Sequence, residues 1–201
     1  MKKFTPIIIA VILALFCRIY LISMFKVPSQ SMAPTLIAGD YVLGTQIYSL
    51  PADGDLVVFV KNSRTFVKRV IAVSGAEIEY KDGGFYLNGA ACSYTQQDGL
   101  FDAGFVLFTE TCANGLPRKI LKASNPAGKP LSFPLTRILP GEFLVASDNR
   151  DFDSNYVAIE VVRADQIVGK PLVVWMSYAS TQDFISKTSG VRWNRILTIL
   201  R

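Results

Sequence analysis

Hydrophobic and polar residues follow two different patterns along this chain. Residues 4–25 are mainly apolar, with Arg18 as the one charged residue, and a run of roughly 22 such residues has the length needed to cross the hydrocarbon core of a bilayer as a helix. After this run come short stretches rich in β-branched and aromatic residues, some of them alternating between apolar and polar positions. This second pattern predicts strands at residues 40–44, 55–60, 65–73, 77–80, 85–89, 105–109, 141–146 and 167–175.

The strand pattern predicts an all-β fold. Turn-forming residues at 61–64 and 81–84 separate neighbouring strands at hairpin spacing, which favours mainly antiparallel pairing. Closely spaced short strands are typical of a coiled sheet or barrel-like domain. A chain of 201 residues has room for one such domain once the N-terminal run is set aside. We therefore expect one all-β domain that follows one N-terminal transmembrane helix.

The N-terminal run fits a retained membrane anchor or a cleaved signal peptide. Lys2 and Lys3 precede the apolar residues, as basic residues do in both kinds of segment. Residues 24–27 supply no small side chain for cleavage, which favours the retained anchor. The two lysines then place the N-terminus in the cytoplasm. The predicted organisation is a membrane anchor at residues 1–26 and an extracytoplasmic, β-rich domain at residues 27–201.

Residues 90–135 are richer in Gly, Pro, Asn and Ser than the predicted strands on either side. We interpret this segment as an insertion that shapes specificity and is not needed for chemistry. Cys92 and Cys112 lie within it. Because disulfides persist outside the cytoplasm, a bridge between these two cysteines is expected, with two free thiols as the alternative.

Composition and charge argue against several kinds of site. The formal net charge is +5, but no dense block of basic and aromatic residues accompanies it, so we expect no nucleic-acid partner. The charge instead suits an anionic membrane-lipid surface. The chain has no histidine, which argues against zinc, and we expect neither a metal nor another cofactor. Without histidine, a serine nucleophile would need a lysine, a carboxylate or an amine as its base.

Ser31 is the candidate nucleophile. It lies in the segment Pro-Ser-Gln-Ser-Met-Ala-Pro-Thr-Leu at residues 28–36, where two prolines restrict the backbone. A stiff, non-helical loop of this kind can hold a hydroxyl and nearby backbone N–H groups in fixed positions. Ser29 would place its hydroxyl on the same side of an extended segment and could donate to a developing oxyanion. The alternative is a linker next to the membrane, because Ser-Gln-Ser is a common loop sequence.

Lys68 is the candidate base. In an alternating strand its side chain shares a face with Phe66, Val70 and Ala72. Burial among such residues lowers the pKa of a lysine, so that its neutral amine could accept the serine proton near pH 7. Arg69, on the opposite face, is expected to face solvent. The alternative is an edge-strand lysine on a charged face.

A polar loop rich in aspartate follows the predicted strand at residues 141–146. Its carboxylates and amides could tie the site together through hydrogen bonds, with Ser154 or Asp153 orienting the lysine. Closely spaced oxygen ligands also suit Ca²⁺, although the loop lacks the Gly and terminal Glu of an EF-hand. The supporting residues that we single out are Asp148, Asn149, Arg150, Asp153 and Ser154.

Three segments of the chain, in order, resemble the type I signal peptidase (leader peptidase) family of serine/lysine proteases. They are residues 28–36 with Gly39 and Asp40, residues 54–59 with 68–75, and residues 147–156. The C-terminal segments 173–177 and 190–195 are also similar to that family. The resemblance implies Ser31 as nucleophile and Lys68 as general base. It also implies an oxyanion hole made by the Ser31 backbone N–H and the Ser29 hydroxyl.

The resemblance further implies a substrate and a place of action. Members of this family sit in the bacterial inner (cytoplasmic) membrane and remove signal peptides from exported precursor proteins, cutting after small residues on the outer side. The final motif is shorter here than is usual and is more similar to the conjugative-transfer branch, so a pilin precursor is the alternative substrate. A non-catalytic, anchored β-domain that serves as a scaffold of a secretion apparatus is the alternative outside enzymology.

Overall fold

The structure, a computed structural model, describes residues 22–47, 49–102, 104–112, 115–125, 132–152, 158–179 and 190–200. Within these ranges the chain is built from strands, with two short 3-10 turns at Ala164–Gln166 and Trp193–Arg195. Every pairing between the described strands is antiparallel. The predicted all-β, antiparallel class is therefore confirmed.

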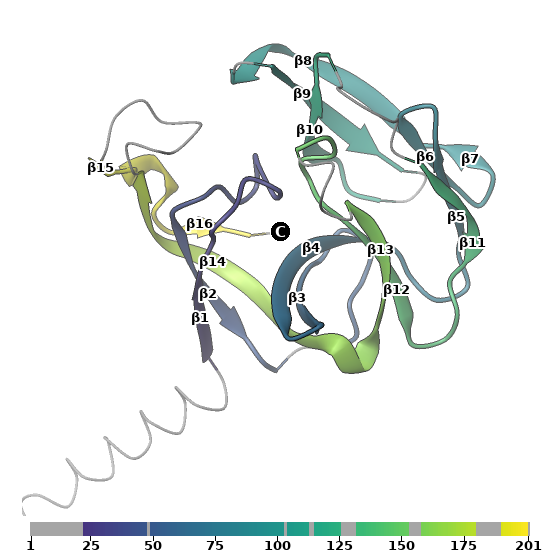
Figure 1. The fold of residues 1–201 in the computed structure, drawn as a ribbon, viewed down its shortest axis with the longest axis horizontal. Coiled ribbons are helices and arrows are strands. Elements are labelled where there is room, and N and C mark those ends of the chain that lie inside the picture. The colour runs from purple at the N-terminus through teal and green to yellow at the C-terminus, as the bar shows by residue number, and fades with distance from the viewer. Residues whose placement is uncertain are drawn as a thin grey trace, which may run out of the picture.

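The largest sheet has nine strands in the order β1-β2-β14-β3-β4-β12-β13, with β15 and β16 paired to β14. Strands β3 and β4 curl strongly at its centre, as Figure 1 shows. The bounds are β1 Ile22–Lys26, β2 Asp40–Thr45, β3 Leu56–Lys61, β4 Arg64–Ala72, β12 Glu142–Ala146, β13 Ile159–Arg163, β14 Ile167–Ala179, β15 Gly190–Val191 and β16 Thr198–Ile199.

Two smaller sheets form the other side of the molecule (Figure 1). A four-stranded sheet has the order β11-β5-β6-β7, and a three-stranded sheet has the order β10-β9-β8. A disulfide joins Cys92 to Cys112, which confirms the predicted bridge. The bounds are β5 Glu77–Lys81, β6 Gly84–Leu87, β7 Ala90–Ala91, β8 Ser93–Asp102, β9 Phe105–Thr111, β10 Arg118–Ala123 and β11 Phe133–Arg137.

Strand β1 corrects the predicted boundary of the anchor. The sequence predicts that residues 22–26 form the end of the membrane anchor, but in the structure Ile22 lies opposite Thr45 and Lys26 lies opposite Tyr41 in an antiparallel pair. An apolar run fits an edge strand as well as a helix, so composition alone does not separate the two. The rest of the predicted anchor falls on residues 1–21, outside the described ranges. Among the described residues, no helix is long and apolar enough to span a bilayer.

Strand β4 separates two apolar clusters. On one face Val70 packs in a buried cluster with Val57, Phe59, Phe143, Val145, Val162 and Ile167. On the other face Val67 packs against a cluster that contains Val27, Met32, Leu36, Val42, Leu56, Val174 and Leu200. The pairing of β4 with β12 shifts register after Val70, and Ala72 therefore joins a third cluster, around Ile71 and Leu144.

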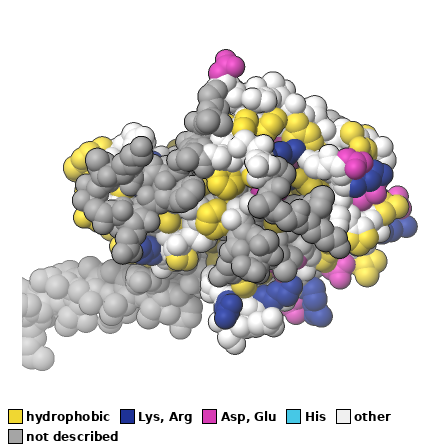
Figure 2. All heavy atoms as spheres, turned by 45° about the horizontal axis from the view of Figure 1, so that its top comes forward, with side chains coloured by type: hydrophobic (Ala, Val, Ile, Leu, Met, Phe, Trp, Pro, Cys, Tyr) yellow, Lys and Arg dark blue, Asp and Glu magenta, His cyan; other side chains and the backbone are white. Residues whose placement is uncertain are grey.

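Charged side chains of both signs are exposed on the described surface. In the view of Figure 2, basic and acidic side chains lie close to one another on the right and lower parts of the face, with hydrophobic side chains between them. Surface ion pairs among the described residues include Arg163 with Asp165 and Lys81 with Glu79.

Candidate active site

The loop between β1 and β2 carries both candidate serines. Ser31 Oγ lies 3.0 Å from Ser29 Oγ, within hydrogen-bond distance. Met32 and Leu36 are buried and pack against apolar side chains of the sheet. At its end Gly39 has a φ of +89°, and a Cβ there would lie 2.0 Å from the Tyr178 carbonyl oxygen, so a side chain at this position would displace the loop.

Asn149, in the polar loop that follows β12, binds the backbone of the serine loop through two hydrogen bonds. Its backbone N–H donates to the Ser31 carbonyl oxygen at 2.9 Å, and its side-chain Nδ2 donates to the Gln30 carbonyl oxygen at 3.3 Å. Asn149 is itself only 3% exposed. The predicted supporting loop therefore contacts the candidate nucleophile directly, through its backbone.

Lys68 is buried on a central strand, with 5% of its surface exposed. It lies opposite Val57 on β3 and shares a face with Phe66 and Val70. The predicted burial is confirmed, and the edge-strand alternative is excluded because β4 lies between β3 and β12. Burial lowers the pKa of Lys68, and the hydrogen bond and charge of Glu160 partly oppose that effect.

Glu160 is a site residue that the sequence did not reveal. Lys68 Nζ donates to Glu160 Oε1 at 2.6 Å, and Lys61 Nζ donates to Oε2 of the same carboxylate at 2.5 Å. Glu160 lies on β13 within an apolar stretch and outside every motif considered above. Its only sequence signal was a single acidic residue in a strand whose neighbours are Ile, Val and Val.

The apolar side chains of the serine loop and the side chain of Lys68 lie on opposite faces of β4. Met32 and Leu36 belong to the cluster against which Val67 packs. Lys68 instead shares the face of Val70 and points toward Glu160. The structure thus joins Ser31 to Ser29 and Asn149, and joins Lys68 to Glu160 and Lys61.

Arg69 links the lysine strand to the other two motifs. Its Nε and NH2 donate to the two carboxylate oxygens of Asp148 at 2.8 and 2.7 Å. The Thr35 hydroxyl donates to Asp148 Oδ2 at 2.5 Å and accepts from Arg69 NH2 at 3.2 Å. The expectation that Arg69 faces solvent is wrong, since it is 4% exposed. The polar loop folds over that face of β4 and supplies the carboxylate that a buried guanidinium requires.

Arg150 ties the same loop to the insertion. It is 2% exposed, its Nε donates to the Ser147 carbonyl at 2.8 Å, and its NH1 lies 2.9 Å from Glu110 Oε2. Arg118 also pairs with Glu110, at 2.7 Å. Burial alone would raise the pKa of Glu110, but the charges of Arg150 and Arg118 outweigh it and lower the pKa to about 2.

Protein donors engage the aspartates that were also considered as calcium ligands. Asp148 binds Arg69 and Thr35, and Asp151 Oδ2 accepts from the Ala123 backbone N–H at 3.0 Å. The two residues expected to orient the lysine, Asp153 and Ser154, lie outside the described residues.

A family model for signal peptidase, peptidase S26, matches residues 1–176. The chain belongs to this family. The three motifs that converge here, around Ser31, Lys68 and Asp148, all fall inside the matched range.

Signal peptidases are also found among individual relatives. The chain is 38% identical to signal peptidase I of Aquifex aeolicus over 85 residues, which is 39% of this chain and 33% of that protein. It is 29% identical to signal peptidase IB of Staphylococcus aureus over 157 residues, covering 75% of this chain and 76% of that protein. A solved signal peptidase I from Enterococcus faecalis aligns with a TM-score of 0.34 at 18% identity, over 62% of this chain and 98% of that one.

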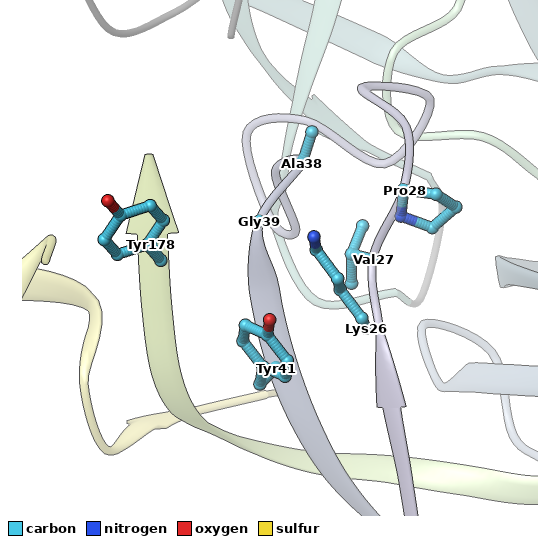
Figure 3. A pocket seen from close by; sticks show the side chains of 7 residues that line it. All are labelled: Lys26, Val27, Pro28, Ala38, Gly39, Tyr41 and Tyr178. Atoms are coloured by element: carbon cyan, nitrogen blue, oxygen red, sulfur yellow. The ribbon is translucent and has the colours of Figure 1, made fainter. Parts of the chain in front are cut away.

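A pocket adjoins the peptidase's serine loop on the side of strands β1, β2 and β14 (Figure 3). It has a volume of about 300 Å³ and is lined by Lys26, Val27, Pro28, Ala38, Gly39, Tyr41 and Tyr178. Lys26 Nζ lies 5.8 Å from the centre of the Tyr41 ring. The described lining includes neither Ser31 nor Lys68, so the pocket flanks the candidate chemistry and does not contain it.

Proposed function

We propose that this protein is a membrane-bound serine endopeptidase that removes signal peptides from exported precursor proteins, with Ser31 as nucleophile and Lys68 as general base. Membership of the signal peptidase family supports the reaction class. The observation that carries the assignment of residues is Lys68, a buried lysine whose burial lowers its pKa. A general base must be unprotonated near the working pH, and burial is the usual way to make a lysine so.

The chemistry follows from the groups present. The neutral Lys68 amine accepts the proton of the Ser31 hydroxyl while Oγ attacks the scissile carbonyl, and the negative charge moves to the carbonyl oxygen. The Ser31 backbone N–H and the Ser29 hydroxyl, whose Oγ lies 3.0 Å from Ser31 Oγ, donate to that oxyanion. The lysine ammonium then protonates the leaving amine. Water hydrolyses the resulting ester and restores the serine.

The mechanism requires the Lys68 amine to come within hydrogen-bond reach of Ser31 Oγ when substrate binds. Catalytic hydrogen bonds are commonly long in free enzymes and tighten only in the complex. A lysine side chain has four flexible methylene groups, which allow its amine to move between partners. The backbone hydrogen bond from Asn149 to Ser31 and the side-chain ion pair of Arg69 with Asp148 keep the serine loop and the lysine strand in one framework while this happens.

We also propose that the protein acts at the outer face of a bacterial cytoplasmic membrane, with its N-terminus inside. Strand β1, Ile22–Lys26, begins directly after the residues left for the proposed anchor, so only residues 22–30 lie between that anchor and Ser31, which keeps the nucleophile close to that surface. Scissile bonds of anchored precursors emerge at this level. The substrate is a precursor with small residues before the cleavage site. The shortened final motif makes a pilin precursor, as in conjugative transfer, the second candidate.

The test is cleavage by the full-length protein solubilised in detergent. A set of secretory precursors and a pilin precursor are each incubated with the wild type, Ser31→Ala and Lys68→Ala. The products are identified by their new N-terminal residues. Matched controls are Ser93→Ala and Lys81→Ala, at an exposed serine and an exposed lysine.

Cleavage by the wild type and both controls, but by neither site variant, is the expected result, and the precursor that is cut decides between general secretion and pilin maturation. Folded wild type that cuts no precursor would overturn the proposal and favour an anchored scaffold. Retained cleavage by Ser31→Ala would show that Ser31 is not the nucleophile.

A further inference from the structure

We propose that Glu160 is a positioning residue for Lys68, and that Lys61, bound to the other oxygen of the same carboxylate, helps to govern the protonation of Lys68. This inference rests on the proposed role of Lys68 as the base.

The sheet places Glu160 beside Lys68 although 92 residues separate them. Glu160 on β13 lies opposite Val145 on β12, and Val145 lies opposite Val70 on β4. Lys68 precedes Val70 by two residues and therefore points to the same face. The carboxylate thus reaches across β12 to the lysine amine, at 2.6 Å, on the face where Val57, Val70 and Val145 pack together.

The carboxylate connects the interior with the surface. The Lys68 side chain is 7% exposed and that of Glu160 is 10% exposed, whereas that of Lys61 is 40% exposed. Glu160 Oε1 pairs with the buried Lys68, and Oε2 pairs with the more exposed Lys61. A Lys–Glu pair alone would hold the buried ammonium charged. The second lysine shares the negative charge and weakens that hold.

Lys68, Glu160 and Lys61 form a charged trio, and burial favours proton release at Lys68. With both lysines protonated the three groups carry a net charge of +1, so loss of one proton makes the cluster neutral. Burial lowers the pKa of Lys68, Glu160 opposes the change, and Lys61 adds to it. Burial would raise the pKa of Glu160, but the hydrogen bonds and charges of the two lysines outweigh it and lower that pKa. Glu160 therefore stays ionised while Lys68 loses its proton.

The other side chains that the described strands pack around Lys68 are apolar or point away from it. Strand β12 presents Val145 to it, and strand β3 presents Val57 and, further along, Lys61. Arg69 points to the opposite face of β4, where it pairs with Asp148. The charged groups that act on the protonation of Lys68 from the described strands are thus Glu160 and Lys61.

Glu160 also fixes the direction of the amine. A neutral lysine has two N–H donors and one lone pair. One N–H donated to Glu160 restricts rotation about the Cε–Nζ bond, so that the lone pair has a defined direction in which to receive the serine proton. Misplacement of a catalytic group by about 1 Å can cost roughly 10²-fold in rate.

The test removes one end of the trio at a time. Glu160→Gln keeps a side-chain oxygen that can accept from Lys68 but removes the charge, and Lys61→Met removes the second lysine charge. Glu79→Gln is the control, because it breaks a more exposed Lys–Glu pair, that of Lys81, on a different sheet. In full-length protein in detergent, the pH midpoint of Lys68 is followed by NMR of 13Cε-labelled lysine. Its signal is assigned by its loss in Lys68→Met. The pH profile of kcat/KM for precursor cleavage is measured alongside.

The two variants should shift the Lys68 midpoint in opposite directions, each by about 1 pH unit or more. Glu160→Gln withdraws the anion that stabilises the ammonium, so the midpoint falls. Lys61→Met withdraws a repelling cation, so the midpoint rises. Glu79→Gln leaves it unchanged. Glu160→Val, which has no acceptor, should also lower kcat by about 10²-fold at the pH where its Lys68 is neutral.

A merely structural role for Glu160 would lower thermal stability and leave both midpoints in place, and that outcome would overturn the inference. The NMR titration needs no substrate. Opposite shifts in a protein that cuts no precursor would therefore support the coupling of Glu160 to Lys68 and count against the proposed peptidase activity. Cleavage whose pH profile neither variant moves would reject the inference and leave the peptidase proposal standing.

Discussion

Arg69 donates two hydrogen bonds to the carboxylate of Asp148, at 2.8 and 2.7 Å, from side chains that are 4% and 0% exposed. This pair joins the strand that carries Lys68 to the loop that binds the backbone of Ser31. Thr35, from the serine loop, donates to the same carboxylate. Three segments that are far apart in sequence thus meet at one buried ion pair, which positions the candidate dyad without taking part in its chemistry.

Substitution of Asp148→Asn should destabilise the fold strongly. It leaves the buried Arg69 charge without its carboxylate, and breaking a buried pair from one side typically costs about 3–5 kcal/mol. The free energy of unfolding of the full-length protein in detergent measures the effect. Asp165→Asn, at a surface pair whose side chains are 68% and 64% exposed, is the control and should change stability by less than about 1 kcal/mol. Equal effects of the two substitutions would contradict this assignment.

Glu110 should make stability depend on acid pH. Its pKa in the folded state is about 2, against an ordinary value of 4.5, so between these values the unfolded chain binds more protons than the folded one. The stabilisation by Glu110 is therefore present above pH 4.5 and is lost as the pH falls toward 2, a loss of about 3 kcal/mol. Glu110→Gln should be less stable than the wild type at pH 7 and approach it near pH 2. A stability difference that is independent of pH would refute this.

The insertion should affect activity as well as specificity. The Leu121 backbone N–H donates to the Asp148 carbonyl, and its carbonyl accepts from the Arg150 N–H, so β10 is bonded on both sides of Asn149. This geometry changes the sequence-based expectation that residues 90–135 are not needed for chemistry.

The disulfide between Cys92 and Cys112 offers a mild way to test that link. Removing a native disulfide typically costs about 2–5 kcal/mol. The double variant Cys92→Ala/Cys112→Ala should have a lower Tm and a lower cleavage rate at temperatures where the nine-stranded sheet remains folded. A lower Tm with an unchanged cleavage rate at every temperature below it would show that the insertion is not coupled to the site.

Ser29→Ala should lower kcat while leaving the fold intact. Loss of one oxyanion donor commonly costs about 10²–10³-fold in kcat, and Ser29 is the side-chain donor placed beside Ser31. Ser124→Ala, at an exposed serine bonded to Gly104, serves as the control. A decrease in Ser29→Ala that appears in KM alone would assign the hydroxyl to substrate binding instead.

Much of the strand pattern could be predicted from sequence because its turns are explicit. The β3–β4 hairpin turns at Asn62 and Ser63, with φ of 50° and 59°, and the β5–β6 hairpin turns at Asp82 and Gly83, with φ of 53° and 77°. Such residues tolerate positive φ and mark hairpins in advance. Strand β1 was missed because an apolar run carries no signal that separates an edge strand from the end of a membrane helix.

The site was predicted where motifs are local and missed where the fold supplies the partner. Lys68 could be expected to be buried from its neighbours in the strand. The exposure predicted for Arg69 was wrong because alternation tells which face a residue takes, but not that Asp148 will cover that face. Glu160 was missed because the pairing of β13 with β12 brings it to Lys68. The local sequence of either segment does not predict which distant strands will pair.

Ser31 and Lys68 are proposed to act together without histidine, and the pH dependence of precursor cleavage is the measurement that distinguishes this dyad from other mechanisms. Rates of the full-length wild type, Ser31→Ala and Lys68→Ala are measured across pH, with circular dichroism to verify folding. The wild-type kcat/KM is expected to rise with pH as Lys68 loses its proton, while both folded variants are expected to be inactive at every pH. A folded Lys68→Ala protein that cleaves with the wild-type pH profile would contradict it.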